Sequence, residues 1–267
     1  MRSRIFVKHR PVPIWGLPSE LAGLKIAHVS DMHFRAWHPV YTQAQQLLIG
    51  LRYDLLAVTG DFSHHPERWR ETADHCRRFF EPLKPPLGTY GVLGNHDDPR
   101  LGHVTDLPLT WLNDESTTIP DHYLRVAGVR QDAFGGGGGI EHALAGAEED
   151  QAVILLAHYP STAYDLPAGR VQLQLSGHTH GGQIRLPLLG ALWTNDRLPR
   201  GMARGLHRVG KTWLHVNPGI GFSSPLRARL LCPPEITVLE LCKVDRSVRR
   251  RSQVDRHVPA FAFDNPQ

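Results

Sequence analysis

Five short groups of aspartate, asparagine and histidine residues stand out along the sequence, because these side chains bind transition metals. The groups are Asp31-Met32-His33, Gly60-Asp61, Gly94-Asn95-His96-Asp97, His158, and Gly177-His178-Thr179-His180. Carboxylate, amide and imidazole ligands without a thiolate suit Mn²⁺, Fe²⁺ or Fe³⁺, and Zn²⁺ better than Ca²⁺. The residue types therefore indicate a metal site and do not choose among manganese, iron and zinc.

The spacing inside two groups places two ligands on one face of the chain. In Asp31-x-His33 and His178-x-His180 the side chains are two residues apart, and alternate residues of an extended segment point to the same side. The candidate metal ligands are Asp31, His33, Asp61, Asn95, His158, His178 and His180. One metal does not need seven ligands, whereas two metals about 3.5–4 Å apart that share a bridging carboxylate would use them all.

Short apolar strands are the elements expected to position these groups. The expected strands are Leu24–Ser30, Asp54–Thr59, Thr89–Leu93, Tyr123–Val126, Ala152–Ala157, Val171–Ser176, Thr212–Val216 and Ile236–Leu241. Helical spacing is present in Pro39–Leu51 and Glu67–Pro82. Ligand sites in open α/β sheets gather at the carboxyl ends of strands. Because all five groups follow expected strands, we expect them to meet at one edge.

The order of the elements predicts an α/β fold. Strand and helix alternate early in the chain, whereas the later strands follow one another too closely for crossover helices. This order predicts two packed sheets with helices outside. We expect one domain over residues 1–242, a basic tail over 243–267, and a flexible loop at Gly135–Gly139. That loop lacks the following Lys-Ser/Thr of a phosphate-binding loop.

Each group taken alone also has an ordinary structural interpretation. The chain has 17 histidines, so any one of them is more often a surface or interior residue than a ligand. An aspartate after a strand commonly caps a helix or closes a turn. Only the ordered set of five groups favours a metal site. Six histidines outside the groups are assigned to the ordinary class: His64, His65, His75, His103, His122 and His142.

Composition and cysteine usage exclude several classes of protein. The 267 residues are 41% hydrophobic and 21% charged, which is typical of a globular domain and excludes a disordered or collagen-like chain. No apolar run approaches the roughly 20 residues that span a bilayer, and the N-terminus lacks a signal-peptide pattern. The three widely spaced cysteines (Cys76, Cys232 and Cys242) disfavour a disulfide framework and a thiolate zinc site. We therefore expect a cytoplasmic protein.

The net charge of +4 belongs to the C-terminal tail. Residues Lys243–Arg256 include six basic and two acidic residues, and the rest of the chain has 24 of each. The tail is interpreted either as solvated or as a peripheral contact with anionic membrane lipid, where each basic residue contributes about 1 kcal/mol. A second basic stretch, Arg197–Lys211, either holds an anionic substrate or is a solvated loop. Nucleic acid is disfavoured, and no protein partner is indicated.

Taken in order, the five groups resemble the motif series of the calcineurin-like metallophosphoesterase superfamily, from about Leu24 to Leu241. The segments Ser176–Gln183 and Val216–Gly221 are similar to a branch of small bacterial phosphodiesterases, often membrane-associated, and relatives that cleave UDP-diacylglucosamine. The resemblance implies a four-layer α/β/β/α sandwich. It also implies two ligand sets with a shared carboxylate: Asp31, His33 and His180 on one metal, Asn95, His158 and His178 on the other, and Asp61 between them.

The implied activity is hydrolysis of a phosphodiester or pyrophosphate bond by hydroxide held between two divalent metals. His96 matches the superfamily's histidine that faces the phosphate without binding metal, and Asp97 is expected to orient it. The expected substrate is a phosphorylated small molecule or a lipid-linked compound. Phe62-Ser63-His64-His65 replaces the Asp-Arg continuation of the protein phosphatases, which disfavours that activity.

Three alternative functions stay open at this point. One is a lipid-precursor enzyme of the UDP-2,3-diacylglucosamine pyrophosphohydrolase type. A nuclease is the second, although it would call for an accessory recognition domain that 267 residues barely accommodate. The third is a non-catalytic metal-binding scaffold, which is disfavoured because all seven ligand positions and His96 are occupied.

Overall fold

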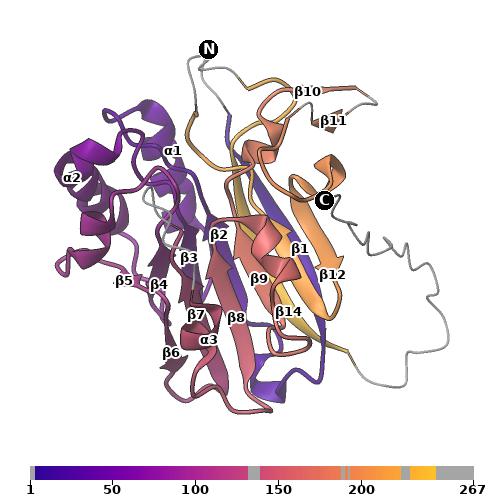
Figure 1. Cartoon of the computed structure of the whole chain (residues 1–267). Helices are drawn as coiled ribbons and strands as arrows, with labels where there is room; N and C mark the ends of the chain where they lie inside the picture. Colours follow the sequence, from indigo (N-terminus) through magenta and orange to yellow (C-terminus); the bar gives the residue numbers. More distant parts are fainter. Residues whose placement is uncertain (1–3, 132–138, 188–189, 192, 224–228, 245–267) are drawn as a thin grey trace, which may run out of the picture.

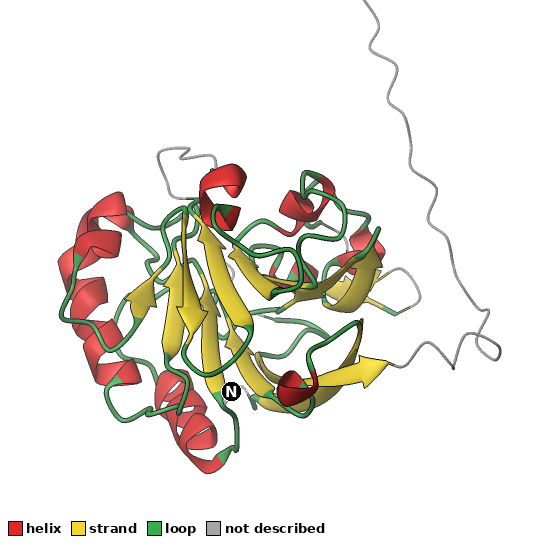
Figure 2. Ribbon diagram, turned by 90° about the horizontal axis from the view of Figure 1, so that it is seen from below, coloured by secondary structure: helices red, strands yellow, loops and turns green. Residues whose placement is uncertain are grey.

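Two six-stranded sheets pack against each other at the centre of the molecule, and helices lie on the outer faces (Figure 1). The computed structural model describes residues 4–131, 139–187, 190–191, 193–223 and 229–244. Seen from below, the strands form adjacent layers with helices outside them (Figure 2). The predicted α/β sandwich of two mixed sheets in a single domain is confirmed.

The first sheet has the strand order β1-β14-β2-β3-β4-β5. Its strands are β1 (Phe6–Trp15), β14 (Glu235–Val244), β2 (Lys25–Val29), β3 (Leu55–Thr59), β4 (Thr89–Val92) and β5 (Thr110–Trp111). Strands β2 to β5 are parallel, and β14 runs antiparallel to β2. The carboxyl ends of β2, β3 and β4 therefore lie together at one edge.

The second sheet has the order β12-β13-β9-β8-β7-β6. Its strands are β12 (Gly205–Val209), β13 (Thr212–Val216), β9 (Leu173–Ser176), β8 (Ala152–Ala157), β7 (Leu124–Val129) and β6 (Glu115–Ile119). The four inner strands are parallel, and the two edge strands are antiparallel to their neighbours. A small separate hairpin consists of β10 (Arg185–Leu186) and β11 (Gly190–Ala191).

Among the residues that the structure describes, three α-helices lie on the outer faces of the sandwich. Helix α1 (Pro39–Gly50) begins at a proline, which suits the first turn, and the Nδ1 atom of His38 accepts a hydrogen bond from the Val40 amide. Helix α2 (Trp69–Phe80) and the short α3 (Ile140–Leu144) complete the set. The 3₁₀ turns are η1 (Ser19–Leu21), η2 (Pro66–Arg68), η3 (Pro99–His103), η4 (Pro160–Tyr164), η5 (His180–Gly182) and η6 (Arg200–Met202).

Separate apolar clusters hold the layers together. The inner faces of both sheets share one cluster that includes Ile26, Leu55 and Leu156. Helices α1 and α2 pack on the first sheet through a second cluster, and α3 packs on the second sheet through a third. Strands β3 and β8 are buried along their whole length, as expected for parallel strands covered on both faces. The sandwich is thus rigid beneath the strand ends that carry the polar groups.

All eight predicted strands and both predicted helices are present. The second helix begins at Trp69, after η2, rather than at Glu67. The expectation that later strands leave no room for crossover elements is wrong, because β7, β8 and β9 are parallel and η4 and α3 lie in their connections. A single turn of helix is enough to return the chain to the start of the next parallel strand, since the strands are short.

Four strands of the two sheets were not predicted: β1, β5, β6 and β12. Each is an edge strand, and edge strands expose one side to solvent, so their sequences carry polar residues and prolines instead of continuous apolar runs. Strand β1 contains Pro11 and Pro13, for example. Strand β12 lies inside the basic stretch Arg197–Lys211, for which the sequence left a substrate-binding segment or a solvated loop open.

Two predicted segments lie mostly or wholly beyond the described residues. They are Gly135–Gly139, of which only Gly139 is described, and the basic tail, of which only Lys243 and Val244 are described, at the end of β14. Within the described residues, no helix is long and apolar enough to cross a bilayer.

Candidate metal centre

The loops after five parallel strands bring the predicted ligands to one place. Asp31 and His33 follow β2, Asp61 follows β3, Asn95 follows β4, His158 follows β8, and His178 and His180 follow β9. Strands β2, β3 and β4 belong to one sheet, and β8 and β9 belong to the other. The centre therefore lies across the top of the interface between the two sheets, where both sets of carboxyl ends meet.

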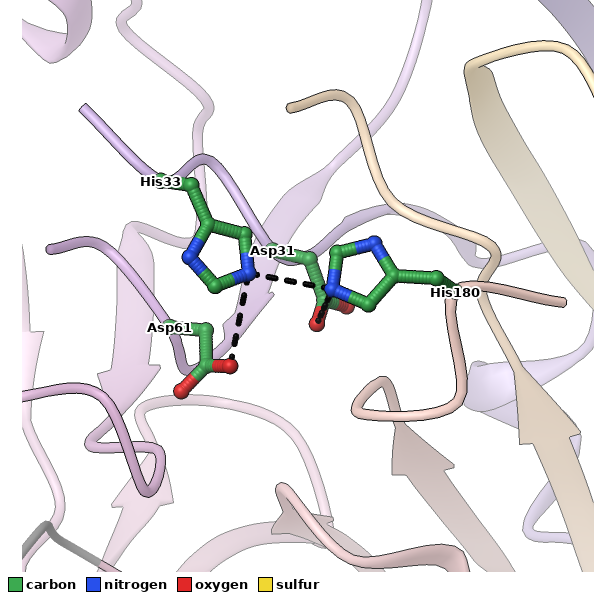
Figure 3. A group of neighbouring side chains, drawn as sticks. All are labelled: Asp31, His33, Asp61 and His180. Atoms are coloured by element: carbon green, nitrogen blue, oxygen red, sulfur yellow. Dashed lines mark hydrogen bonds and ion pairs between the residues drawn. The ribbon is translucent and has the colours of Figure 1, made fainter. Parts of the chain in front are cut away.

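Asp31, His33, Asp61 and His180 form a buried cluster in which one ligand atom from each lies within 4.8 Å of the others (Figure 3). The Nε2 atom of His180 lies 3.2 Å from Asp31 Oδ1 and 3.0 Å from His33 Nε2. His33 Nε2 lies 3.5 Å from Asp61 Oδ2. Two carboxylates and two imidazoles that converge in this way fit a transition metal.

A second group of ligand atoms lies on the other side of Asp61. His158 Nε2 is 3.3 Å from Asp61 Oδ1 and 3.1 Å from Asn95 Oδ1. The ring of His178 lies edge-on to the ring of His158, with the centroids 5.1 Å apart. The two oxygens of Asp61 thus face different groups, Oδ2 toward His33 and Oδ1 toward His158. This is the placement that a bridging carboxylate requires.

The outer hydrogen bonds of three histidines fix which ring nitrogen is free. Each donates to a backbone carbonyl: His33 Nδ1 to Ser63 (3.1 Å), His158 Nδ1 to Thr59 (2.7 Å), and His178 Nε2 to Asn195 (2.9 Å). Since a carbonyl only accepts, the bonded nitrogen carries the proton and the other nitrogen of a neutral ring keeps its lone pair. Metal-binding histidines are held in this way. The residues present therefore fit metal ions.

A family model and several curated relatives match this chain. Residues 24–182 match the model described as calcineurin-like phosphoesterase. The chain belongs to that family. The uncharacterized metallophosphoesterase YkuE of Bacillus subtilis is 30% identical over 237 residues, which cover 84% of this chain and 81% of that protein. The phosphodiesterase YaeI of Escherichia coli is 28% identical over 232 residues, covering 82% and 83%. The predicted superfamily is confirmed, and the protein is a metallophosphoesterase.

Solved structures also match this phosphoesterase. A dimetal phosphatase from Danio rerio is 11% identical, with a TM-score of 0.45; the match covers 74% of this chain and 88% of that one.

Burial keeps most histidines of the phosphoesterase site neutral. It lowers the pKa of His33 to about 3 and the pKa of His178 to about 4, because a charged ring loses its hydration there. The pKa of His180 is also well below its usual value, from burial and from the charges of His33 and Arg229. Neutral imidazole is the form that binds metal.

The pKa values of His158, Asp61 and Asp31 depend on one another, because these groups are close together and can be charged. Burial lowers the pKa of His158, but the Asp61 carboxylate and its hydrogen bond raise it more, to about 9. The same pairing holds the pKa of Asp61 well below its usual range despite burial. Burial raises the pKa of Asp31 to about 7. Positive charge between these groups is therefore favourable, and a metal supplies it.

Five of the predicted ligands have left-handed backbone conformations. Their φ angles are 52° at Asp31, 46° at His33, 55° at Asp61, 66° at His178 and 49° at His180. Residues other than glycine seldom adopt this region, and strain of this kind clusters at functional sites. The segments around Asp31-x-His33 and His178-x-His180 are therefore tight turns, and the prediction that they are extended is wrong.

Close backbone packing at two glycines supports the same loops. A Cβ atom on Gly60 would lie 2.7 Å from His158 Nδ1, and one on Gly219 would lie 2.6 Å from Asp31 Cβ. Both residues also have positive φ angles, 83° and 80°. Only glycine fits at either position.

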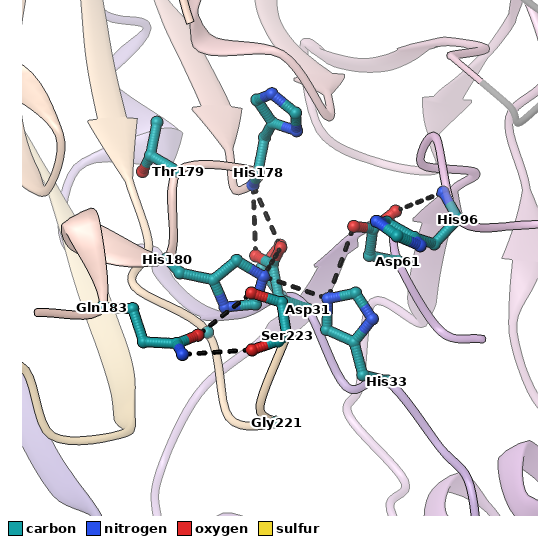
Figure 4. A network of polar contacts seen from close by, with 12 residues as sticks. Asp31, His33, Asp61, His96, His178, Thr179, His180, Gln183, Gly221 and Ser223 are labelled. Atoms are coloured by element: carbon teal, nitrogen blue, oxygen red, sulfur yellow. Dashed lines mark hydrogen bonds and ion pairs between the residues drawn. The ribbon is translucent and has the colours of Figure 1, made fainter. Parts of the chain in front are cut away.

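His96 lies beside the ligand cluster. Its backbone N–H donates to Asp61 Oδ1 at 2.8 Å, and its half-buried ring is 5.1 Å from the ring of His33 (Figure 4). The backbone N–H of His178 similarly donates to both oxygens of Asp31, each at 3.2 Å. These two donors hold the carboxylates of Asp61 and Asp31 in place.

Asp97 does not make the contact that was expected of it. Its carboxylate accepts from the backbone N–H groups of Phe62 (3.2 Å), Ser63 (2.7 Å) and Gly94 (2.9 Å). Within the described residues, no contact joins it to the ring of His96. The buried carboxylate instead ties the loop after β3 to the loop after β4, and so positions Asp61. The interpretation that Asp97 orients His96 is replaced by this structural role.

Two residues near the centre were missed from the sequence. His64 was assigned to the ordinary class, but its ring stacks 6.4 Å from that of His96 and contacts Arg35. Its position three residues after Asp61 was the available signal. Arg229 donates to the carbonyls of Pro218 (2.8 Å) and Gly221, and lies 3.4 Å from His180 Nδ1. No sequence pattern marked Arg229.

The basic stretch Arg197–Lys211 divides between two places. Arg197 and Arg200 line a groove near the metal centre. Arg208 and Lys211 belong to the β12–β13 hairpin, at the end of the sheet away from the ligand loops. Only the first half of the stretch can reach a substrate at this centre. Binding of an anionic substrate there stays a prediction.

Proposed function

We propose that this phosphoesterase hydrolyses phosphodiesters with two metal ions held on either side of Asp61. The observation that carries the proposal is the division of the Asp61 oxygens, with Oδ2 facing His33 and Oδ1 facing His158. The similarity to the Escherichia coli phosphodiesterase YaeI supports the phosphodiester class. The ligand types favour manganese, iron or zinc.

The chain's own residues would bind and orient these metals. Asp31, His33 and His180 would hold one metal, and Asn95, His158 and His178 the other. When bound, two such cations neutralise phosphate oxygens and lower the pKa of water so that hydroxide is available near neutral pH. The protein contributes hydrogen bonds from His33, His158 and His178 to backbone carbonyls, which leave the other ring nitrogen of each histidine available for a metal.

His96 would act on the leaving oxygen of the ester. Its ring lies beside the cluster, is half-buried and serves neither ligand group. An imidazolium at this position can donate a proton or stabilise developing negative charge. The ring of His64 stacks on the ring of His96 and so helps to hold its orientation.

A substrate comparison tests the proposal. Protein reconstituted with Mn²⁺, Fe²⁺ or Zn²⁺ should hydrolyse bis(p-nitrophenyl) phosphate faster than p-nitrophenyl phosphate. Metal analysis should find two ions per chain in the active form. Hydrolysis of the monoester alone would overturn the phosphodiesterase assignment, and one ion per active chain would overturn the dinuclear one.

A further inference from the structure

A groove of about 750 Å³ lies against the second group of ligand residues. Its size is typical of small-molecule sites. Two residues of its wall touch His178 directly. The carbonyl of Asn195 accepts from His178 Nε2 at 2.9 Å, and the ring of Tyr159 lies edge-on, 4.3 Å from the His178 ring. A group esterified to a phosphate at the metal centre would therefore extend into this groove.

The wall of the groove combines polar groups with the aromatic rings of Tyr159 and Trp193. Gln131, Ser161, Thr162 and Asn195 supply amides and hydroxyls. The described residues that line it include no aliphatic hydrophobic side chain. The apolar part of the wall therefore belongs mainly to aromatic rings that stand among hydrogen-bonding groups, an arrangement that matches a polar ring better than a lipid tail.

The charges of the groove are balanced. Its wall contains two carboxylates, Asp165 and Asp196, and two guanidinium groups, Arg197 and Arg200. Arg197 donates to Asp165 at 2.8 Å, and Asp196 accepts from the hydroxyl of Ser161 at 3.1 Å. With no net charge, the groove suits a neutral group better than a second phosphate.

Trp193 adds a flat aromatic surface to this wall. Its side chain is 72% exposed, although large aromatic residues are usually mostly buried. An exposed indole can stack on a planar ring, and base–aromatic stacking tolerates any base. The amides and hydroxyls nearby can bond to the edge of such a ring.

We propose that this groove binds the nucleoside of a nucleotide phosphodiester, with its base stacked on Trp193. The proposal rests on the phosphodiesterase function and names its substrate class. A neutral, planar group rich in hydrogen-bonding atoms fits a wall that is aromatic, offers hydrogen bonds and has balanced charges.

Two esters with one leaving group provide the test. The p-nitrophenyl ester of thymidine 5′-monophosphate carries a nucleoside, and methyl p-nitrophenyl phosphate carries only a methyl group. Metal-loaded wild-type protein should show a lower KM for the thymidine ester. Trp193→Ala should raise that KM about tenfold and leave the methyl ester within about twofold. Trp193→Phe should keep most of the preference.

Trp15→Ala is the matched control. Trp15 is also exposed, at 43%, and ends β1 at the edge of the sheet away from the ligand loops. It should change neither KM. Thymidine 5′-monophosphate should inhibit hydrolysis of the methyl ester, and Trp193→Ala should weaken that inhibition by a similar factor.

The outcomes distinguish a failure of the nucleoside assignment from a failure of the phosphodiesterase function. Equal KM values for the two esters in the wild type would overturn the nucleoside assignment while leaving the phosphodiesterase function supported. An equal loss on both esters in Trp193→Ala would also overturn it, because Trp193 would then only support His178. If the wild type hydrolyses neither ester, the proposed function itself fails.

Discussion

The two ligand groups that share Asp61 differ in how they meet solvent. Asp31, His33 and His180 are almost completely buried, and Gly221, whose carbonyl accepts from Arg229, donates its backbone N–H to the carbonyl of Asp31. In the second group His158 is fully buried, whereas Asn95 is half-buried and His178 adjoins an open groove. The first group is therefore suited to retaining an ion, and we infer that the substrate approaches from the second.

The largest effect is expected where the two groups meet. Asp61→Asn replaces the carboxylate whose oxygens face both groups, so it should abolish hydrolysis of bis(p-nitrophenyl) phosphate. Metal analysis should show that neither ion is retained at full occupancy, while circular dichroism shows a folded chain. Asp106→Asn, at an exposed aspartate, is the control. Full activity of Asp61→Asn would contradict the bridging assignment.

His96 belongs to neither group, and its removal should separate chemistry from metal binding. His96→Ala should lower kcat by about 10²- to 10⁴-fold, the usual contribution of a general acid. Both ions should stay bound, as measured by metal analysis. His103→Ala, at an exposed histidine, should leave kcat unchanged. Loss of an ion from His96→Ala would show that His96 is a ligand.

Asp97 accepts hydrogen bonds from backbone N–H groups of the two loops that carry Asp61 and Asn95, and so holds residues of both ligand groups in place. Asp97→Ala removes the acceptor of three buried N–H groups, each of which costs about 1–3 kcal/mol when left unsatisfied. The free energy of unfolding should fall accordingly, as measured by urea denaturation. Asp106→Ala is the control, because the side chain of Asp106 is 67% exposed where it pairs with Arg77. If Asp97 only oriented the ring of His96, Asp97→Ala would instead lower kcat and leave the free energy of unfolding unchanged.

The inner strands and the residues that follow them could be predicted from the sequence for one physical reason. A strand buried on both faces needs a continuous apolar run, as in Ala152–Ala157, and a polar residue directly after it marks the strand end. The grouping of Asp31, Asp61 and His158 follows from that rule. Edge strands such as β1 lack the apolar run and were therefore missed.

The supporting contacts could not be predicted, because they depend on chain segments far apart in sequence. Arg229 lies near His180, 49 positions earlier in the sequence, only once the strands around the centre have assembled. Asp97 follows His96 in the sequence, which suggested a link between them. Its carboxylate instead points to amides on two loops, a direction that the local sequence does not specify.

The smallest effect concerns a histidine pair that lies outside both ligand groups. His215 Nδ1 is 2.8 Å from His28 Nδ1 between the two sheets, and burial lowers the pKa of His215 to about 3. The unfolded chain therefore binds a proton at this residue below about pH 6.5 that the folded chain does not. Stability should fall as the pH drops from 6.5 toward 3, by at most about 1.4 kcal/mol per pH unit for this group.

Replacing His215 tests the origin of that loss. His215→Leu removes the titrating ring, so its unfolding free energy should depend less steeply on pH between 6.5 and 4, measured in urea with metals chelated. His9→Leu, at an exposed position on β1, should keep the wild-type slope. Because His28 and the ligand histidines stay intact in both variants, an unchanged slope in His215→Leu would show that His215 is not a source of the acid sensitivity.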